Sequence, residues 1–270
     1  MAQRQGRTLP PSPSAERARA RGLRASQPGG RSPVTAKLAS LSVCMPAYNE
    51  EANVGAMVDE VLAVCRPLTD DLEVVVVDDG SKDRTAEVVL ERAKVHPEVR
   101  LVRHPVNQGY GAAVYDAFAA ATKEFIFFTD SDKQFVVEEI AKLIPHLEHA
   151  DLVAGYRAPR RDPWHRVLYG WGWTALVTLL FGYTVRDVDC AFKLFRREII
   201  EKVGPQIASR GATFSAEWLV RAKRAGYRFA EVPVTHLPRK HGAQTGARLN
   251  VISRAFKELI RFRMRLWREG

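Results

Sequence analysis

Short apolar runs alternate with amphipathic stretches from residue 41 onward. Runs such as Val74–Val77 lack the polar alternation of a half-exposed strand, so we expect strands that are covered on both faces. The connections between them are long enough for right-handed helical crossovers. The pattern therefore predicts an α/β fold with a mainly parallel sheet flanked by helices. We expect strands at Leu41–Met45, Glu73–Val77, Val99–Arg103, Phe125–Thr129 and Asp151–Gly155, with helices at Glu51–Cys65, Thr85–Lys94, Gly109–Ala121 and Val137–His149.

Polar clusters follow four of these strands. They are residues 46–50 (PAYNE), 78–81 (DDGS), 107–111 (NQGYG) and 130–134 (DSDKQ). Ligands on parallel sheets bind beyond the carboxyl ends of the strands, so all four clusters are expected on one edge of the sheet.

The most informative cluster is Asp130-Ser131-Asp132, which comes directly after the apolar run Phe125–Phe128. Alternate positions at a strand end can turn two carboxylates toward one point. Carboxylate, amide and water oxygens are ligands that Mg²⁺ and Mn²⁺ prefer, usually together with substrate phosphates. A solvated loop or a helix cap is the alternative for two nearby aspartates.

The charge is concentrated at the two ends of the chain. The net charge of +10 comprises +7 in residues 1–37, +5 in residues 248–270 and −2 in the middle. This distribution argues against a nucleic-acid cleft in the core and favours tails that meet an anionic surface. With 270 residues and 46% hydrophobic content, one catalytic domain is the simplest organisation. We expect a disordered basic tail at 1–38, a catalytic domain at 39–247 and a basic amphipathic helix at 248–270.

Three cysteines, Cys44, Cys65 and Cys190, occur without CxxC or zinc-type spacing. A disulfide framework and a structural metal are therefore not indicated, and a reducing cytosol fits. The first residues have no apolar core of the kind that a secretory signal needs, and their Pro/Ser/Arg/Ala/Gly composition is that of a disordered segment. A transit peptide is the alternative, although several prolines interrupt any amphipathic helix there.

Five motifs in order resemble a known family. PAYNEE, VVDDGSKDRT, NQGYGAA, DSDKQF and DCAFKLFRR look like those of a family 2 glycosyltransferase of the dolichol-phosphate mannose synthase or polyprenyl-phosphate glycosyltransferase type. The resemblance covers roughly residues 41–248. It implies the GT-A (Rossmann-like) fold and a nucleotide-sugar donor.

The resemblance also implies roles for single residues. It assigns the donor diphosphate to a divalent ion on Asp130 and Asp132, with Gln134 as a third ligand. From the residues alone, Asp79 can instead cap the next helix, and Gly109 with Gly111 can serve only a turn and a tight helix–sheet contact. The nucleotide-sugar-binding residues are expected to be Pro46, Ala47, Tyr48, Glu50, Asp79, Gly109, Asp130 and Ser131, with Asp78 beside Asp79.

Arginines are expected to hold the acceptor phosphate. Arg157 and Arg239 match phosphate-handling positions of the family, and Arg166 is a weaker third match. Asp132, Arg157 and Arg239 are the expected catalytic residues. The chain departs from some relatives at Gly170, where a hydroxyl residue is expected, and at the GAQTGAR segment after Arg239. Asp187, Asp189 and Glu217 are candidates for orienting sugar hydroxyls or arginines, or they are ordinary loop and helix-end carboxylates.

The resemblance implies an inverting, metal-dependent transfer of a hexose from a UDP- or GDP-sugar to a polyprenyl phosphate. A lipid monophosphate is already anionic at pH 7, so it needs no general base, whereas a sugar hydroxyl normally does. No QxxRW segment of processive synthases is present. A glycosyltransferase with a hydroxyl acceptor and a non-catalytic nucleotide-sugar-binding module are the rival readings.

Two segments suggest contact with a membrane. Val167–Val185 carries no charge, and we favour an interfacial segment at residues 164–185 over a spanning helix or a buried core helix. Residues Val251–Trp267 place arginines and a lysine opposite apolar side chains at helical spacing, which fits anionic lipid or the protein's own core. The expected location is peripheral, on the cytoplasmic face of a membrane. The nucleotide, the sugar, the lipid length and the oligomeric state stay open at this point, and a homo-oligomer is one of the options.

Overall fold

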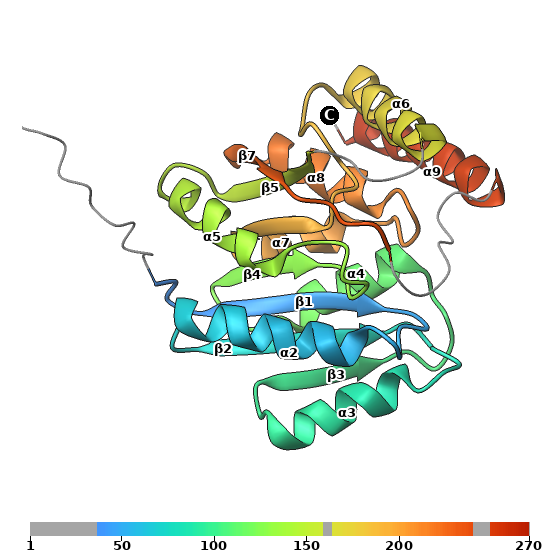
Figure 1. Cartoon of the computed structure of the whole chain (residues 1–270). Coiled ribbons are helices and arrows are strands. Elements are labelled where there is room, and N and C mark those ends of the chain that lie inside the picture. Colours follow the sequence, from blue (N-terminus) through green and yellow to red (C-terminus); the bar gives the residue numbers. More distant parts are fainter. Residues whose placement is uncertain (1–36, 159–163, 240–248, 270) are drawn as a thin grey trace, which may run out of the picture. The chain divides into compact units, whose positions relative to one another are not determined.

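The computed structural model describes residues 37–158, 164–239 and 249–269 (Figure 1). Chain contacts divide the protein into two units, Met1–Val34 and Thr35–Gly270. The expected disordered tail falls almost entirely outside the described residues, and only the second unit is considered below. Leu38, the last residue assigned to that tail, is buried and forms a parallel bridge with Thr69, so the fold begins by this residue.

A seven-stranded sheet forms the centre of this unit, in the order β3-β2-β1-β4-β6-β5-β7. Strands β1, β2, β3 and β4 are mutually parallel, as the unbroken apolar runs predict, and β5 is parallel to β7. The side chains of β1 and β4 are buried along their whole length. The strands are β1 (Leu41–Ala47), β2 (Leu72–Asp78), β3 (Val99–Arg103), β4 (Phe125–Thr129), β5 (Leu152–Arg157), β6 (Phe192–Arg196) and β7 (Phe229–Val234).

The sheet differs from the expected one because β6 and β7 were not predicted and β6 runs antiparallel between β4 and β5. Since β6 opposes both neighbours, β5 still points the same way as β4, and the start of β6 lies at the edge where β4 and β5 end. Strand β7 contains Pro233, which lacks a backbone N–H, and accordingly lies at the sheet edge.

Helices cover both faces of the sheet (Figure 1). Helices α2 and α3 pack against each other, and α4 packs with α7 and α8. The first helix begins at Val54 rather than at the expected Glu51, because residues 51–53 form a turn. The helices are α2 (Val54–Cys65), α3 (Thr85–Val95), α4 (Tyr110–Ala120), α7 (Glu198–Val203) and α8 (Phe214–Arg224), with short 3₁₀ turns at Arg66–Leu68 and Gly204–Gln206.

The expected helix Val137–His149 is wrong as a single element. It is divided into a 3₁₀ turn at Val137–Glu139, the single-turn helix α5 (Ile140–Leu143) and a second 3₁₀ segment at Ile144–Glu148. Pro145 lies in the first turn of that second segment. Its missing N–H and its ring prevent a regular α-helix from continuing through this point.

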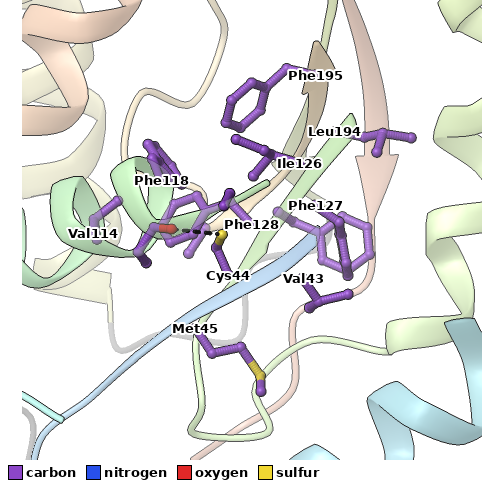
Figure 2. Packing of buried hydrophobic residues seen from close by; sticks show 14 of the residues in the cluster. Val43, Cys44, Met45, Val114, Phe118, Ile126, Phe127, Phe128, Leu194 and Phe195 are labelled. Carbon is purple, nitrogen blue, oxygen red and sulfur yellow. Dashed lines mark hydrogen bonds between the residues drawn. The ribbon is translucent and has the colours of Figure 1, made fainter. Parts of the chain in front are cut away.

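Aromatic rings fill the core between the sheet and α4. Phe118 of α4 packs edge-on against Phe128 of β4, at 5.3 Å between ring centroids, and against Phe195 of β6, at 5.1 Å. Figure 2 shows these rings beside Cys44 of β1, whose thiol donates to the carbonyl of Ala117 at 3.3 Å. Edge-to-face pairs at this spacing are favourable beyond the area that they bury. The core therefore fixes α4 on the strands that carry the acidic cluster.

Two long helices, α6 (Trp164–Phe181) and α9 (Leu249–Arg268), lie side by side (Figure 1). The ring of Phe181 in α6 stacks on Phe262 in α9 with 4.8 Å between centroids. The predicted C-terminal amphipathic helix is thus confirmed as α9, whose apolar face, with Leu259, Phe262 and Leu266, joins the core. Among the helices within the described ranges, none is sufficiently long and apolar to span a bilayer.

A buried ionic network attaches α9 to α8. The carboxylate of Glu217 is fully enclosed and accepts from Arg221 and Arg265, at 3.1 Å in each case, and from the backbone N–H of Ser209 at 2.9 Å. Arg221 also pairs with Glu269 just beyond α9, at 2.9 Å. Glu217 was a candidate for orienting sugar hydroxyls or arginines. In the structure it is a carboxylate that binds two arginines and holds α8 and α9 together.

The close contact of α4 with the segment before α8 predicts that Gly111→Ala destabilises the protein. A Cβ at Gly111 would lie 2.6 Å from Cβ of Phe214 and closer still to the carbonyl oxygen of Gly211. Overpacking against backbone costs about 1–3 kcal/mol of unfolding free energy. Gly172→Ala in α6 is the control, because its Cβ would meet no atom within 4 Å and alanine favours helix by about 1 kcal/mol. Urea denaturation measures both, and equal stabilities of the two variants would contradict the prediction.

The network around Glu217 predicts a pH-dependent stability. Burial raises the pKa of Glu217, but the hydrogen bonds from Ser209 and Ala208 and the charge of Arg265 outweigh this and lower the pKa below its usual 4.5. A lowered pKa stabilises the folded state above pH 4.5, and this contribution is lost as the pH falls through the lowered value.

Glu217→Gln should therefore reduce the unfolding free energy at pH 7 by roughly 3 kcal/mol, as expected for removing one partner of a buried pair. The difference from wild type should shrink below pH 4.5. Glu91→Gln, in the exposed pair with Arg84, serves as control and should change stability by less than about 0.5 kcal/mol. If the difference in unfolding free energy between wild type and Glu217→Gln is the same at pH 3.5 and pH 7, the lowered pKa of Glu217 is not the source of this stability.

Candidate active site

The carboxyl ends of the parallel strands bring the polar clusters together at one edge of the sheet. Ala47 at the end of β1 lies opposite Asp78 at the end of β2, and β4 ends at Thr129, directly before Asp130. The hydroxyl of Ser131 donates to the carbonyl of Pro46 at 2.8 Å, which joins the segments after β4 and β1. The sequence expectation of a single edge for these clusters therefore agrees with the strand register.

Asp130 and Asp132 form the acidic centre of this edge. Asp130 accepts from the hydroxyl of Tyr110 at 3.0 Å, and the nearly buried Asp132 accepts from the backbone N–H of Gln134 at 3.1 Å. Desolvation and the charge of Asp132 raise the pKa of Asp130 to about 7. Two neighbouring carboxylates, one of which raises the pKa of the other, create a strong local demand for a cation.

A guanidinium meets part of this demand. Arg239 donates to Asp132 at 3.3 Å and makes a short contact with the carboxylate of Glu50. The chain delivers Arg239 here because residues after β7 pair with the segment after β4: Leu237 donates its N–H to the carbonyl of Gln134 at 2.7 Å. Arg239 and Asp132, which are more than a hundred positions apart in the sequence, thus meet because their segments pair through the backbone.

The residues present fit a divalent cation. Burial and the charge of Asp132 raise the pKa of Asp130, and Arg239 occupies a position where positive charge is stabilised. The amide nitrogen of Gln134 donates to the carbonyl of Leu237 at 3.1 Å, which leaves the amide oxygen as the atom able to bind a metal. Within the described residues, no group of three or more acidic, histidine or cysteine side chains forms a complete metal cage. Such a site needs oxygens from substrate and water as well.

A second arginine lies at the end of β5. Arg157 makes a two-pronged ion pair with Asp187, with Nε and one Nη each 2.7 Å from a carboxylate oxygen. Asp187 reaches it because β6 enters the sheet in the opposite direction, so the segment before β6 lies at the edge where β5 ends. The pair is about nine-tenths buried, which makes it rigid as well as strong. Arg157 and Asp187 are thereby brought together as the sequence suggested.

Lys193, which belongs to the DCAFKLFRR motif, is buried near this pair. Its ammonium is buried and donates to the carbonyls of Val188, at 3.2 Å, and Cys190. Burial lowers the pKa of Lys193, while the carboxylates of Asp187 and Asp189 counteract this. The lysine therefore fixes the segment that carries both aspartates. Along the chain, Lys193 lies between Phe192 and Leu194, both buried strand residues.

The expected nucleotide-binding residues occupy different environments. Tyr48 is partly exposed, whereas Asp79 is nearly buried and accepts from the backbone N–H groups of Gln108, at 2.8 Å, and Gly109, at 2.9 Å. Glu50 faces Asn53, at 2.7 Å, as well as Arg239. Asp79 and Glu50 thus bind groups of their own chain, and the Asp79 carboxylate makes no cap for the helix after β2.

The remaining candidate residues from the sequence divide between the site and other parts of the protein. Glu217 belongs to the α8–α9 network, while Asp189 is near enough to Arg157 and Tyr110 to influence the pKa of both. The side chain of Arg166 and the GAQTGAR segment lie outside the described residues. Sequence analysis also missed His104, whose two ring nitrogens contact Asp79 and Asp116; the signal was a histidine directly after the third strand.

Comparison with known proteins agrees with this architecture. The glycosyl transferase family 2 profile matches residues 42–204. The chain is 33% identical to dolichyl-phosphate beta-glucosyltransferase ALG5C of Trichomonas vaginalis, over 70% of this chain and 61% of the relative. It is 32% identical to undecaprenyl-phosphate 4-deoxy-4-formamido-L-arabinose transferase of Photorhabdus laumondii, over 61% of this chain and 51% of the relative. The matched part thus spans only half to three fifths of these curated relatives.

A solved structure shares the fold. Glucosyl-3-phosphoglycerate synthase from Mycobacterium tuberculosis, in complex with Mn²⁺, uridine diphosphate and glucosyl-3-phosphoglycerate, superposes with a TM-score of 0.63 at 23% identity. The likeness covers 83% of this chain and 80% of that one, which confirms the expected GT-A fold. The family profile covers more than half of the chain and includes all the strand ends that build the acidic centre. The chain therefore belongs to glycosyl transferase family 2.

Proposed function

We propose that the protein transfers a hexose from a nucleoside diphosphate sugar to a polyprenyl phosphate, with inversion, at the cytoplasmic face of a membrane. The observation that carries the proposal is the meeting of an acidic pair, Asp130 and Asp132, with two arginines, Arg157 and Arg239, at one sheet edge. Carboxylates suit a metal-bound diphosphate, and arginines suit a second phosphate. The names of two relatives, a dolichyl-phosphate and an undecaprenyl-phosphate transferase, support a lipid phosphate as the acceptor.

The chemistry requires one bond to form and one to break. An acceptor phosphate oxygen attacks the anomeric carbon, and the bond from that carbon to the donor diphosphate breaks as the nucleoside diphosphate leaves with its electron pair. Because the acceptor is already anionic, no residue has to remove a proton from it. Arg157 binds and orients the acceptor phosphate, while Asp187 holds the guanidinium in place. Arg239 provides positive charge on the side of the acidic pair.

Asp130 and Asp132, with the amide oxygen of Gln134, would hold Mg²⁺ or Mn²⁺ in this proposal. The ion supplies charge neutralisation for the leaving diphosphate. The hydroxyl of Tyr110 orients Asp130, and the backbone N–H of Gln134 orients Asp132. The Mn²⁺ and uridine diphosphate named with the mycobacterial structure support both a divalent ion and a uridine donor.

The surface of α6 and α9 supports attachment to a membrane. Both helices bury one face and leave large apolar side chains in solvent on another. On α9 these alternate with exposed arginines, which suits a lipid surface with anionic head groups. The exposed apolar residues are Trp164, Leu168, Tyr169, Trp171 and Leu179 on α6, with Tyr183 just beyond it, and Phe256, Ile260, Met264 and Trp267 on α9.

The proposal predicts metal-dependent labelling of a lipid phosphate. Purified protein in detergent is given polyprenyl phosphate and radiolabelled UDP- or GDP-hexoses, with Mn²⁺ or with EDTA. We expect labelled lipid that is released by mild acid, as glycosyl phosphates are, and that EDTA abolishes. Asp132→Asn should reduce the rate on the order of 100-fold or more, because the leaving charge is no longer neutralised.

Asp59→Asn is the matched control, since Asp59 pairs with Arg92 on the outer helices and should leave the rate unchanged. An acid-stable product formed on a hydroxyl compound such as phosphoglycerate would replace the lipid acceptor with a soluble one. Tight donor binding without transfer to any acceptor would instead indicate a binding module.

The pairing of Arg157 with Asp187 predicts an effect on the acceptor. Arg157→Lys keeps the charge but loses the planar two-pronged geometry, so the KM for polyprenyl phosphate should rise roughly 10-fold or more, while the donor KM stays within about twofold. Arg228→Lys is the control, because Arg228 makes the same kind of pair with Asp151 at the opposite end of β5. Steady-state kinetics in both substrates measures the split. A rise confined to the donor KM would move Arg157 to the diphosphate side.

A further inference from the structure

Asp79 accepts hydrogen bonds from three consecutive residues of one loop. Its two carboxylate oxygens accept the backbone N–H groups of Gln108 and Gly109, at 2.8 and 2.9 Å, and its backbone carbonyl accepts from the amide of Asn107 at 3.2 Å. Gly109 has a φ of +101°, a conformation that glycine adopts without strain. A single buried carboxylate therefore fixes the shape of residues 107–109, immediately before α4.

His104 clasps this carboxylate from the other side. Its Nδ1 lies 2.7 Å from Oδ1 of Asp79, and its Nε2 lies 2.9 Å from Oδ2 of Asp116 in α4. Carboxylate oxygens only accept, so the ring satisfies both contacts when each nitrogen carries a hydrogen. The imidazole is nearly buried, and its backbone N–H donates to the carbonyl of Asp78 at 2.9 Å, which fixes its position after β3.

The loop held by Asp79 is also connected to the acidic centre. Tyr110 follows Gly109 directly and donates its hydroxyl to Asp130 at 3.0 Å. A path of hydrogen bonds and one peptide segment thus leads from Asp116 through His104 and Asp79 to the loop and to Asp130. A change at His104 can reach the proposed metal and diphosphate site although the histidine is separated from Asp130 by the loop.

We propose that His104 is a positioning residue for the nucleoside diphosphate sugar. It holds Asp79, and through Asp79 the loop 107–110, in the conformation that receives the donor, while Asp116 orients the imidazole ring. This inference rests on the proposed function only in assuming that this sheet edge binds a nucleoside diphosphate. Asp79 then uses most of its own hydrogen-bonding capacity to organise the loop.

The test separates donor binding from catalysis. We expect His104→Ala to raise the Kd of UDP or GDP, measured by calorimetry with Mn²⁺, about tenfold, as for the loss of one charge-assisted hydrogen bond. The donor KM should rise equally, while kcat at saturating donor changes less than about twofold. His104→Gln keeps one amide donor for Asp79 and should restore part of the affinity. His96→Gln is the control, because His96 lies at the far end of α3 beside Arg66 and should bind like wild type.

Asp116→Asn keeps the proposal falsifiable if His104→Ala does not fold. Its side chain is two-fifths exposed, so the substitution is tolerated, and loss of ring orientation should raise the Kd a few-fold. A folded His104→Ala with wild-type Kd, or a fall in kcat with unchanged Kd, overturns the inference. Wild type that binds neither nucleotide overturns the donor assignment as well. Wild type that binds but labels no lipid overturns only the acceptor, because the Kd values still judge His104.

Discussion

The parallel alignment of β1 with β2 and β4 is the constraint on which the rest of the structure depends. Three strands buried on both faces have to end at the same edge, and the sequence places polar residues after each of them. Strand β6 follows the same logic in reverse, because its beginning, with Asp187 before it, lies where its neighbours end. Hydrophobic burial along the strands thus determines which charges meet.

At this edge the carboxylates lie next to groups that stabilise negative charge. Burying like-charged carboxylates is unfavourable, and each acidic group at the edge has a basic or hydrogen-bonding partner: Arg239 on Asp132 and Glu50, Tyr110 on Asp130. A guanidinium and a divalent cation satisfy the same electrostatic need. In the proposed function, a divalent cation would complete this arrangement, so that the anionic donor diphosphate meets positive charge at the edge.

Local patterns in the sequence predicted most of the fold and the acidic centre. Apolar runs gave five strands, and the positions of Asp130, Asp132 and Arg157 followed from strand ends. The sequence did not predict the antiparallel β6, because a five-residue run with Lys193 in it carries no sign of direction. The contact of Arg239 with Glu50 joins residues 189 positions apart, and His104 with Asp79 joins neighbouring strands. Such pairs depend on strand order, which periodicity does not encode.

The C-terminal helix α9 is connected to the first turn of α4 by a short path of hydrogen bonds. Thr213 donates to the carbonyl of Ala255 in α9 at 3.1 Å, and the backbone carbonyl of Arg210 accepts from Ala112 in the first turn of α4 at 2.9 Å. The segment between Arg210 and Thr213 is thus packed between the helix that exposes apolar and basic groups and the helix that follows the loop held by Asp79. In the proposed function, these two hydrogen bonds connect the surface suited to lipid with the edge suited to a nucleoside diphosphate.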